Sequence, residues 1–262
     1  MQTWVYNSFS EAYMSVLEDV YKHPDFDINM EDPNAGKGKK FNQASLMEKI
    51  GYRFVIKEPK ADDIYPITKS EKRNKVIRNY IDKEVVLFDE GNNNSDGQMS
   101  QLSKVWEIIS NADGTINSNY GLMVYHTKDA GNLKYQPEQG LLSQWEWAKN
   151  RLIERADTGQ AIMHFNRPSH QWTKNRDQPC TVFIQFIIRE NKLHLFGFMR
   201  SNDVVYGTPY NISYFIRLMY RMIGELKPYY PDLKVGNYTH SATSLHIYKR
   251  NLDKVKNMLG YN

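Results

Sequence analysis

The sequence predicts an α+β fold, a single domain over residues 1–262 in which helices pack on a mixed β-sheet. Apolar residues recur with a period near 3.6 in three segments, which is typical of amphipathic helices. These helical segments are residues 9–22, 71–88 and 210–226. Two near-continuous apolar runs, at 181–188 and 193–200, indicate buried strands. Neither an internal repeat nor a change in composition divides the chain, so we expect one domain.

The first 70 residues begin with the first of these helices, for which Ser8 or Ser10 could act as the N-cap. Residues 25–40 are rich in Asp, Asn, Gly and Lys and contain a proline, a composition typical of an extended loop. The Gly-Lys-Gly-Lys-Lys run at 36–40 could bind a phosphate, but a solvated basic loop is the commoner structure.

The second helix carries Glu84 just beyond the centre of its apolar stripe. A solvated helical glutamate is the simple interpretation, and a functional carboxylate is the alternative. Residues 91–97 are rich in Asn and Gly and predict a surface loop. Trp106 follows in a short helical pattern, where a core tryptophan and a cleft-lining tryptophan are both open interpretations.

The second half of the chain is more regular. Residues 161–165 predict a short strand, and the polar run 189–192 predicts the turn between the two long strands. Because both long strands are apolar throughout, we expect them to be buried on two faces, against helices and against a partner sheet. The third helix begins beside Asn211, which could be its N-cap.

Composition limits the class of protein. A chain of 262 residues buries enough surface to fold without crosslinks, and its only cysteine cannot form an internal disulfide, so we expect a reducing compartment. The N-terminus lacks a signal-peptide pattern, and no early apolar stretch approaches the ~20 residues of a membrane span. The net charge of +4 is too small and too evenly spread to predict nucleic-acid binding. We therefore expect a cytoplasmic protein with no membrane or nucleic-acid partner.

Cys180 is the strongest candidate for chemistry, although a lone cysteine can also be a small buried structural residue. The reactive form of cysteine is the thiolate, and a nearby cation such as Arg200 would lower its pKa from the ordinary ~8.5. Arginine also binds phosphate through two hydrogen bonds. Asn211 offers one donor and one acceptor on a planar amide, which could hold the edge of a ring. This set predicts attack on an electron-poor ring that carries an anionic tail.

Several ordered motifs resemble those of the thymidylate synthase superfamily. They extend over roughly residues 80 to 250, and some are especially similar to the phage branch that makes hydroxymethylated pyrimidine nucleotides. The motifs are residues 80–88, 116–121 (INSNYG), 166–169 (NRPS), 178–181 (QPCT), 199–207 (MRSNDVVYG), Asn211 and 244–248 (SLHIY).

The resemblance implies a role for each motif residue. Cys180 would add to carbon 6 of a pyrimidine, Glu84 would be the catalytic glutamate, and Tyr120 would orient a water that removes the proton from carbon 5. Asp203 would hold a water or the cofactor ring. Substrate binding is implied for Arg200, Ser201, Asn211, His246 and Tyr248.

The resemblance also implies partners. Methylenetetrahydrofolate would donate the one-carbon unit as co-substrate and would contact Glu84, Trp106 and Asp203. Two copies would pair their sheets in a homodimer. No metal is expected, since the histidines form no metal-binding motif and one cysteine cannot build a cysteine-rich zinc site. The similarity to the phage branch also implies that the protein could be encoded by a phage and act in the host cytoplasm.

Two features depart from the family pattern. Gly159 stands where the family has an arginine that reaches the partner's substrate phosphate, which should weaken monophosphate binding by roughly 1.5 to 3 kcal/mol unless Arg155, Arg167 or a lysine substitutes. The chain stops 14 residues after Tyr248, without the segment that closes over folate in methylating members.

These departures bear on the product. Closure of an active site protects a reactive intermediate from water, so we expect an open site to yield a hydroxymethylated uracil nucleotide from a substrate such as dUMP. Ordinary thymidylate synthesis is the first alternative. A non-catalytic nucleotide-binding or regulatory protein is the second.

Overall fold

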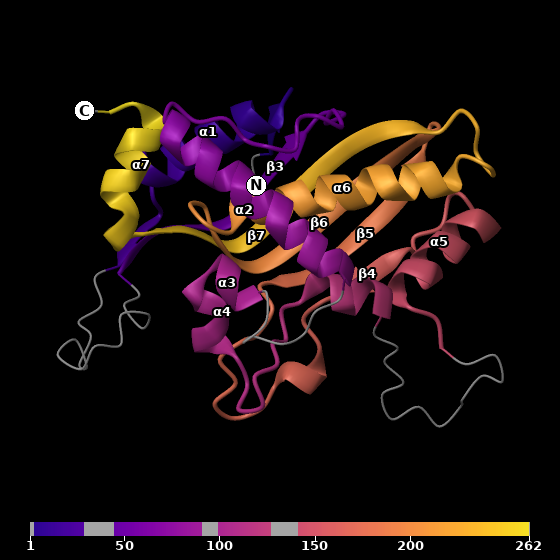
Figure 1. The fold of residues 1–262 in the computed structure, drawn as a ribbon. Coiled ribbons are helices and arrows are strands. Elements are labelled where there is room, and N and C mark those ends of the chain that lie inside the picture. The colour runs from indigo at the N-terminus through magenta and orange to yellow at the C-terminus, as the bar shows by residue number, and fades with distance from the viewer. Residues whose placement is uncertain (1–2, 29–44, 91–98, 127–140, 262) are drawn as a thin grey trace. The chain divides into compact units, whose positions relative to one another are not determined.

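A computed structural model describes residues 3–28, 45–90, 99–126 and 141–261 (Figure 1). Its seven strands form one sheet in the order β1-β3-β7-β6-β5-β4, with β2 paired to β3. β1 runs parallel to β3, whereas β2 and β7 run antiparallel to β3, and β4 antiparallel to β5. The strands are β1 (Trp4–Tyr6), β2 (Phe26–Ile28), β3 (Leu46–Ile56), β4 (Ile162–His164), β5 (Thr181–Arg189), β6 (Lys192–Asp203) and β7 (Lys234–Tyr248). The predicted α+β class and mixed sheet are confirmed.

The helices lie before, between and after these strands. They are α1 (Phe9–Lys22), α2 (Glu71–Glu90), α3 (Ser100–Leu102), α4 (Lys104–Ile109), α5 (Gln144–Glu154), α6 (Thr208–Leu226) and α7 (Leu252–Leu259). Short turns of other helix types are η3 (Leu122–His126), η4 (Pro168–His170) and η5 (Lys249–Asn251). None of the helices in the described part of the chain is long and apolar enough to cross a membrane.

Most predicted elements are confirmed within a few residues. α1 has the predicted bounds, and Ser8 is its N-cap because its side chain accepts a hydrogen bond from the Glu11 N–H at 3.1 Å. Ser10 instead accepts from the Ile67 N–H, so it is not the cap. In the turn between β5 and β6, Glu190 and Asn191 both have positive φ angles, 50° and 55°, as a tight two-residue hairpin requires. The prediction of a loop over 25–40 is wrong at its start, where β2 (Phe26–Ile28) pairs with β3; residues 29–40, including the basic run at 36–40, and the predicted loop at 91–97 lie outside the described residues.

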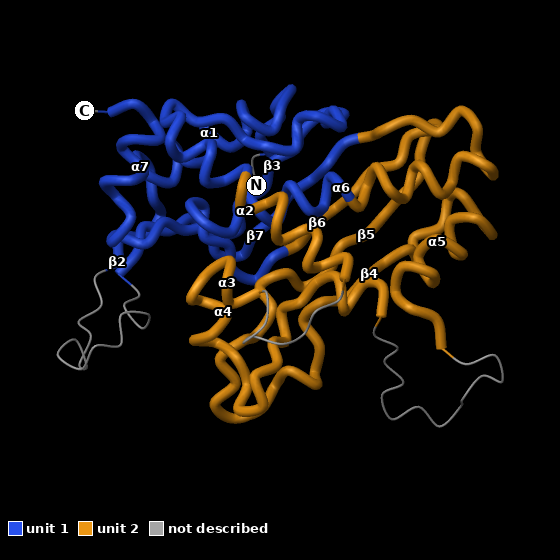
Figure 2. The backbone as a smooth tube through the Cα atoms, viewed as in Figure 1, with its two compact units in different colours: residues 1–78, 199–217, 237–262 blue, residues 79–198, 218–236 orange. Residues whose placement is uncertain are grey.

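The chain divides into two compact units (Figure 2). The first comprises residues 1–78, 199–217 and 237–262, and the second comprises 79–198 and 218–236. The helices α2 and α6 and the strands β6 and β7 each contribute residues to both. A single domain over 1–262 stays a prediction.

Each unit has its own apolar core. In the first unit, Phe9, Tyr13 and Leu17 on one face of α1 and Phe54 on β3 are fully buried. In the second unit, Phe165, Ile184 and Phe186 are fully buried.

The hairpin β5–β6 buries one of its faces within the chain. Ile184 and Phe186 are buried, while the alternate positions Phe183 and Phe198 are half-buried and stack at 5.6 Å with nearly parallel rings. Because successive side chains of a strand point to opposite faces, the second face keeps a partly open aromatic surface. The predicted burial is therefore confirmed for one face, and burial of the other face against a partner sheet stays a prediction.

Candidate active site

Cys180 lies immediately before β5 in the second unit and is half-buried. Both of its neighbours are held by hydrogen bonds. The Asn166 side-chain amide donates to the Pro179 carbonyl at 3.1 Å, and the Thr181 backbone N–H and hydroxyl both donate to the Tyr120 hydroxyl, at 3.3 and 2.9 Å. The backbone on both sides of the thiol is therefore fixed.

Tyr120 is the predicted site residue that the structure brings together with Cys180. Its ring stacks on Phe88 at 5.6 Å and meets Phe165 edge-on at 4.7 Å. Burial raises the pKa of its phenol, and the charge of Cys180 adds to that increase. The next residue, Gly121, allows this packing, because a side chain there would overlap the Phe88 backbone carbonyl.

Asp177 is a buried residue that the sequence analysis did not identify. Its carboxylate accepts hydrogen bonds from the Asn117 N–H at 2.5 Å, the Ser118 N–H at 2.8 Å and the Ser118 hydroxyl. It thereby joins the segment that carries Tyr120 to the segment that carries Cys180. No local sequence signal marks it, because its partners lie about 60 residues away along the chain.

Glu84 on α2 is buried, with 6% of its surface exposed, so the interpretation as a solvated helical glutamate is wrong. Burial raises the pKa of its carboxyl to about 8, against an opposing hydrogen bond from the Tyr80 hydroxyl. A desolvated carboxyl favours its neutral form. Glu84 therefore holds a proton at neutral pH.

Trp106 on α4 is half-buried, and its indole N–H donates to the Tyr80 hydroxyl at 3.1 Å. Trp106, Tyr80 and Glu84 thus form a hydrogen-bonded series inside the second unit. Tyr80 was not predicted as a site residue, although its spacing of four residues from Glu84 on a helix would have placed the two side chains together. Contact of Trp106 or Glu84 with a folate stays a prediction.

The first unit holds the residues predicted to bind the substrate. Arg200 and Ser201 lie near the end of β6, where Arg200 is exposed and Ser201 is half-buried. Cys180 and Arg200 belong to different compact units, so their interaction stays a prediction.

His246 on β7 is buried, with 3% of its surface exposed. The Ser244 hydroxyl donates to the Glu48 carboxylate, so its oxygen is free to accept from the Nδ1–H of His246 at 3.2 Å. Nε2 of His246 is buried without a hydrogen-bond partner among the described residues. Burial lowers the pKa of the ring, against an opposing effect of Asp203. A neutral His246 therefore presents Nε2 as an acceptor for a donor such as a ligand hydroxyl.

Asp203, at the end of β6, lies close enough to His246 for their charges to interact. Its carboxylate accepts from the Val205 N–H at 2.8 Å, and burial raises its pKa. The ring of Tyr248 meets the His246 ring edge-on at 4.8 Å. The structure therefore brings Asp203, His246 and Tyr248 together, and their ligand contacts stay predictions.

Asn211 lies inside the first turn of α6, which begins at Thr208. Its backbone N–H donates to the Gly207 carbonyl at 2.9 Å, a bond of the helix itself. The alternative that Asn211 is the N-cap is therefore wrong. Its side-chain Oδ1 accepts instead from the Asn202 amide at 3.4 Å, and the residue is half-buried.

Gly159 is exposed, and a Cβ added there would have no atom within 4 Å. Of the proposed substitutes for the missing arginine, Arg155 forms an exposed ion pair with Asp157 at 3.0 Å. Whether any cation replaces the missing contact stays a prediction.

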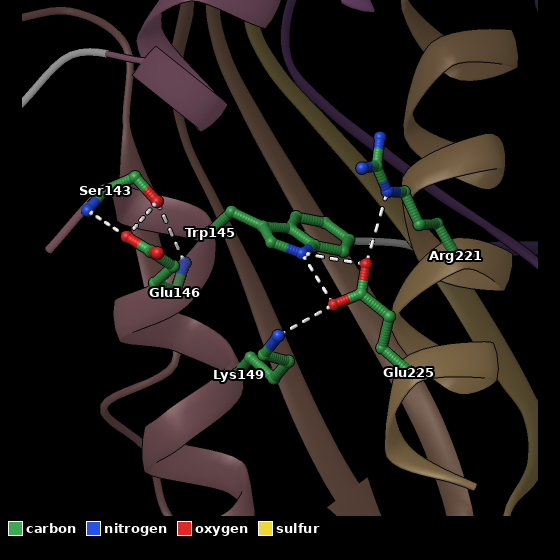
Figure 3. Close-up of polar contacts among 6 residues, drawn as sticks. All are labelled: Ser143, Trp145, Glu146, Lys149, Arg221 and Glu225. Atoms are coloured by element: carbon green, nitrogen blue, oxygen red, sulfur yellow. Dashed lines mark hydrogen bonds and ion pairs between the residues drawn. The ribbon is translucent and has the colours of Figure 1, made fainter.

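A second polar cluster of the second unit joins α5 to the end of α6 (Figure 3). The Glu225 carboxylate accepts from the Trp145 indole at 3.1 Å and pairs with Lys149 at 2.9 Å and Arg221 at 3.3 Å. The start of α5 is fixed by a capping box between Ser143 and Glu146. The polar groups of this cluster pair with one another, so we interpret the cluster as structural: it holds α5 against α6.

Comparison with known proteins points to one family. The family described as Thymidylate synthase matches residues 12–261. The chain is 26% identical over 210 residues to the deoxycytidylate 5-hydroxymethyltransferase of Enterobacteria phage T6, covering 78% of this chain and 76% of that protein. It is 31% identical over 137 residues to the deoxyuridylate hydroxymethyltransferase of Bacillus phage SP01, covering 50% and 33%. It is 26% identical over 152 residues to thymidylate synthase 1 of Bacillus spizizenii, covering 58% and 50%.

Proposed function

Because the chain belongs to the thymidylate synthase family, whose members are one-carbon transferases, we propose that it hydroxymethylates carbon 5 of a uracil nucleotide such as dUMP. One observation carries the proposal: a single compact unit holds a half-buried thiol anchored beside Tyr120 and a buried Glu84 that keeps its proton at neutral pH. These are the nucleophile and the acid that the reaction needs.

Cys180 acts first in the proposed reaction. Its thiolate adds to carbon 6 of the ring, which makes carbon 5 nucleophilic. Arg200 binds the phosphate. After carbon 5 bonds to the one-carbon unit, a water oriented by Tyr120 takes the proton from carbon 5. Loss of that proton would break the bond between the one-carbon unit and the folate nitrogen, so that tetrahydrofolate leaves and an exocyclic methylene remains on carbon 5. A second water would add its hydroxyl to this methylene and release its other proton, and the electrons would expel the Cys180 thiolate from carbon 6.

Glu84 supplies a proton donor. When the thiolate adds, negative charge develops on the oxygen of carbon 4, and a neutral carboxyl can donate a hydrogen bond to it. The raised pKa of Glu84 supports this role, because an ordinary carboxylate would be ionised and would repel the charge. The hydrogen bond from Tyr80 keeps the carboxyl oriented.

His246 binds the sugar in this proposal. Its unpartnered Nε2 is an acceptor, and a sugar hydroxyl is a donor. Tyr248 and Ser201 bind the sugar and phosphate beside it. A sugar hydroxyl that donates to Nε2 of His246 would remove the free-energy cost of burying this acceptor without a donor.

Asn211 selects the base. The relatives differ on this point, since one is named for deoxycytidylate and another for deoxyuridylate. An amide offers one donor and one acceptor, which match O4 and the N3 proton of uracil. A carboxylate would suit the amino group of cytosine instead. Asn211 therefore supports a uracil nucleotide.

Methylenetetrahydrofolate supplies the one-carbon unit when it is bound. The chemistry of the predicted contacts suits a folate, because Asp203 offers carboxylate acceptors to ring N–H groups and the half-buried Trp106 offers an aromatic surface. Glu84 remains available to the substrate.

The product distinguishes two candidate functions. Hydroxymethylation is supported by the phage hydroxymethyltransferase that aligns with 78% of the chain. Ordinary thymidylate synthesis is the second candidate, supported by the family profile and by the Bacillus relative. The phage relatives also support an enzyme that is phage-encoded and acts in the host cytoplasm.

We further propose a homodimer formed through the sheet. The half-buried stacked rings of Phe183 and Phe198 support it, because a partner sheet would complete their burial. Sedimentation at micromolar concentration should give a dimer, and a monomer would contradict the proposal.

The reaction is tested by incubating the protein with dUMP labelled with tritium at carbon 5 and with methylenetetrahydrofolate. Release of tritium requires a competent nucleophile, so its absence would overturn the enzymatic proposal. Mass spectrometry then identifies the product. A gain of CH2O with release of tetrahydrofolate supports hydroxymethylation. A gain of CH2 with dihydrofolate formation supports thymidylate synthesis and refutes it.

A further inference from the structure

A buried series of polar side chains ends at Asn211 and lies wholly within the first unit. We call it the His240 chain; its members are Tyr238 and His240 on β7, Asn202 on β6, and Asn211 on α6. The Tyr238 hydroxyl lies 2.8 Å from His240 Nδ1, and His240 Nε2 lies 3.2 Å from Asn202 Oδ1. Tyr238 and His240 are fully buried and Asn202 is 2% exposed.

The hydrogen-bond directions in this chain follow from what each atom can do. A side-chain carbonyl oxygen only accepts, so His240 Nε2 must carry the proton that Asn202 Oδ1 receives. Burial lowers the pKa of His240 to about 3, so the ring is neutral and has one N–H. Nδ1 must therefore accept from the Tyr238 hydroxyl.

Asn202 is consequently held in one orientation. Its Oδ1 accepts from His240 and also from the Thr208 hydroxyl at 2.6 Å. Rotating this amide would require three coupled changes: the His240 ring would change tautomer, the Tyr238 hydroxyl would become the acceptor, and the Thr208 hydroxyl would turn to the Asp203 carbonyl at 3.5 Å. Its Nδ2 therefore points to Asn211 Oδ1, at 3.4 Å. A Cβ at Gly207 would lie 2.8 Å from the same Nδ2, so glycine leaves the room that this orientation needs.

The fixed amide of Asn202 also determines the orientation of the Asn211 amide, because the two are hydrogen-bonded. Uracil presents a donor at N3 and an acceptor at O4, whereas cytosine presents an acceptor at N3 and a donor at the amino group. A freely rotating amide could match either edge by exchanging its oxygen and nitrogen. In this protein the rotation would bring the NH2 group of Asn211 against the NH2 group of Asn202.

We propose that His240 and Asn202 are positioning residues for base selection, which hold the Asn211 amide in the orientation that reads uracil and prevent it from reading cytosine. The inference rests on the proposed function, in which Asn211 contacts the base. It adds that selectivity depends on a buried histidine that does not touch the substrate.

The test replaces His240 by phenylalanine, which keeps a ring of similar size and removes the donor to Asn202. Both kcat/KM and the affinity without folate are measured for dUMP and for dCMP on the same preparation. Loss of one orienting hydrogen bond should lower the dUMP-to-dCMP ratio by roughly three- to tenfold. Partial unfolding lowers both values equally, so it leaves the ratio unchanged.

Three variants serve as controls. His240→Gln restores an N–H donor near the position of Nε2 and should return the ratio toward the wild-type value. Tyr238→Phe keeps the Nε2 donor and should change the ratio by less than twofold or so. Tyr52→Phe removes a hydroxyl that hydrogen-bonds Asp19 at 2.9 Å elsewhere in the same unit, and should leave the ratio unchanged.

The outcomes separate the inference from the proposed function. A wild-type protein that neither binds nor converts either nucleotide overturns the proposed function. A wild-type preference for dUMP that survives His240→Phe overturns the positioning role and leaves the function intact. A wild-type preference for dCMP that moves toward dUMP in His240→Phe overturns the uracil assignment and supports the positioning role.

Discussion

Replacing Glu84 by glutamine should change how the stability of the protein depends on pH. The wild-type carboxyl is buried, with a pKa near 8 in the folded chain against an ordinary value of 4.5. Between these values the unfolded chain loses its proton while the folded chain keeps it. Folding then takes up a proton, so the contribution of Glu84 is fully present below about pH 4.5 and is lost as the pH rises toward 8.

The size of the effect follows from the shift. The free energy of unfolding should fall by up to ~1.4 kcal/mol per pH unit in the middle of this window, and by roughly 3.5 kcal/mol between pH 5 and pH 8, because the slope is smaller near each pKa. Glutamine has a similar size and does not titrate, so the unfolding free energy of Glu84→Gln should not show this decrease with pH. The unfolding free energy of Glu84→Gln minus that of the wild type should therefore increase as the pH rises.

Urea unfolding of both proteins at intervals from pH 5 to pH 8 measures this difference. Other titrating groups contribute equally to both and cancel. Glu90→Gln is the matched control, because Glu90 is exposed at the end of the same helix. A difference between wild type and Glu84→Gln that stays constant over the window would refute the reasoning that burial keeps Glu84 protonated.

Three further variants test the active site. Cys180→Ala should abolish tritium release from carbon 5 while nucleotide affinity by calorimetry stays within roughly tenfold, because the thiol acts in the covalent step; full activity would remove Cys180 from the mechanism. Asn211→Asp should move the ratio of kcat/KM toward the cytosine nucleotide, and an unchanged ratio would mean that Asn211 does not read the base. Gly159→Arg has open space for its side chain and should tighten monophosphate binding by roughly ten- to a hundredfold in a dimer; an unchanged Kd would mean that position 159 lies away from the phosphate.

The sequence predicts three of the helices well because their apolar stripes are long, whereas α5 and α7 are shorter and were not predicted. α1, α2 and α6 each carry such a stripe, and each lies within a few residues of its predicted bounds. β7 was recognised only through its last residues, although it is 15 residues long. Its buried positions include Thr239, His240 and His246, and polar residues hide the alternation that marks a strand.

The candidate site shows the same limit. Cys180, Glu84 and Tyr120 were found because motifs mark them, and the structure adds the burial and contacts that motifs cannot give. Asp177 and His240 were missed because their roles depend on distant partners: Asn202 and His240 are 38 residues apart. Such residues are recognised only when the fold brings the partners together.

The series from Trp106 to Glu84 has a mechanical consequence. Tyr80 and Glu84 are four residues apart on α2, so the rise of the helix, about 6 Å over that interval, sets their spacing. A displacement of this part of α2 carries both side chains together and keeps their hydrogen bond, whereas the burial that raises the pKa of Glu84 depends on the residues packed around it. Trp106 lies on a separate short helix, α4. A movement of α4 against α2 would alter the hydrogen bond that the Trp106 indole donates to the Tyr80 hydroxyl, so α4 is one element whose motion reaches the surroundings of the acid.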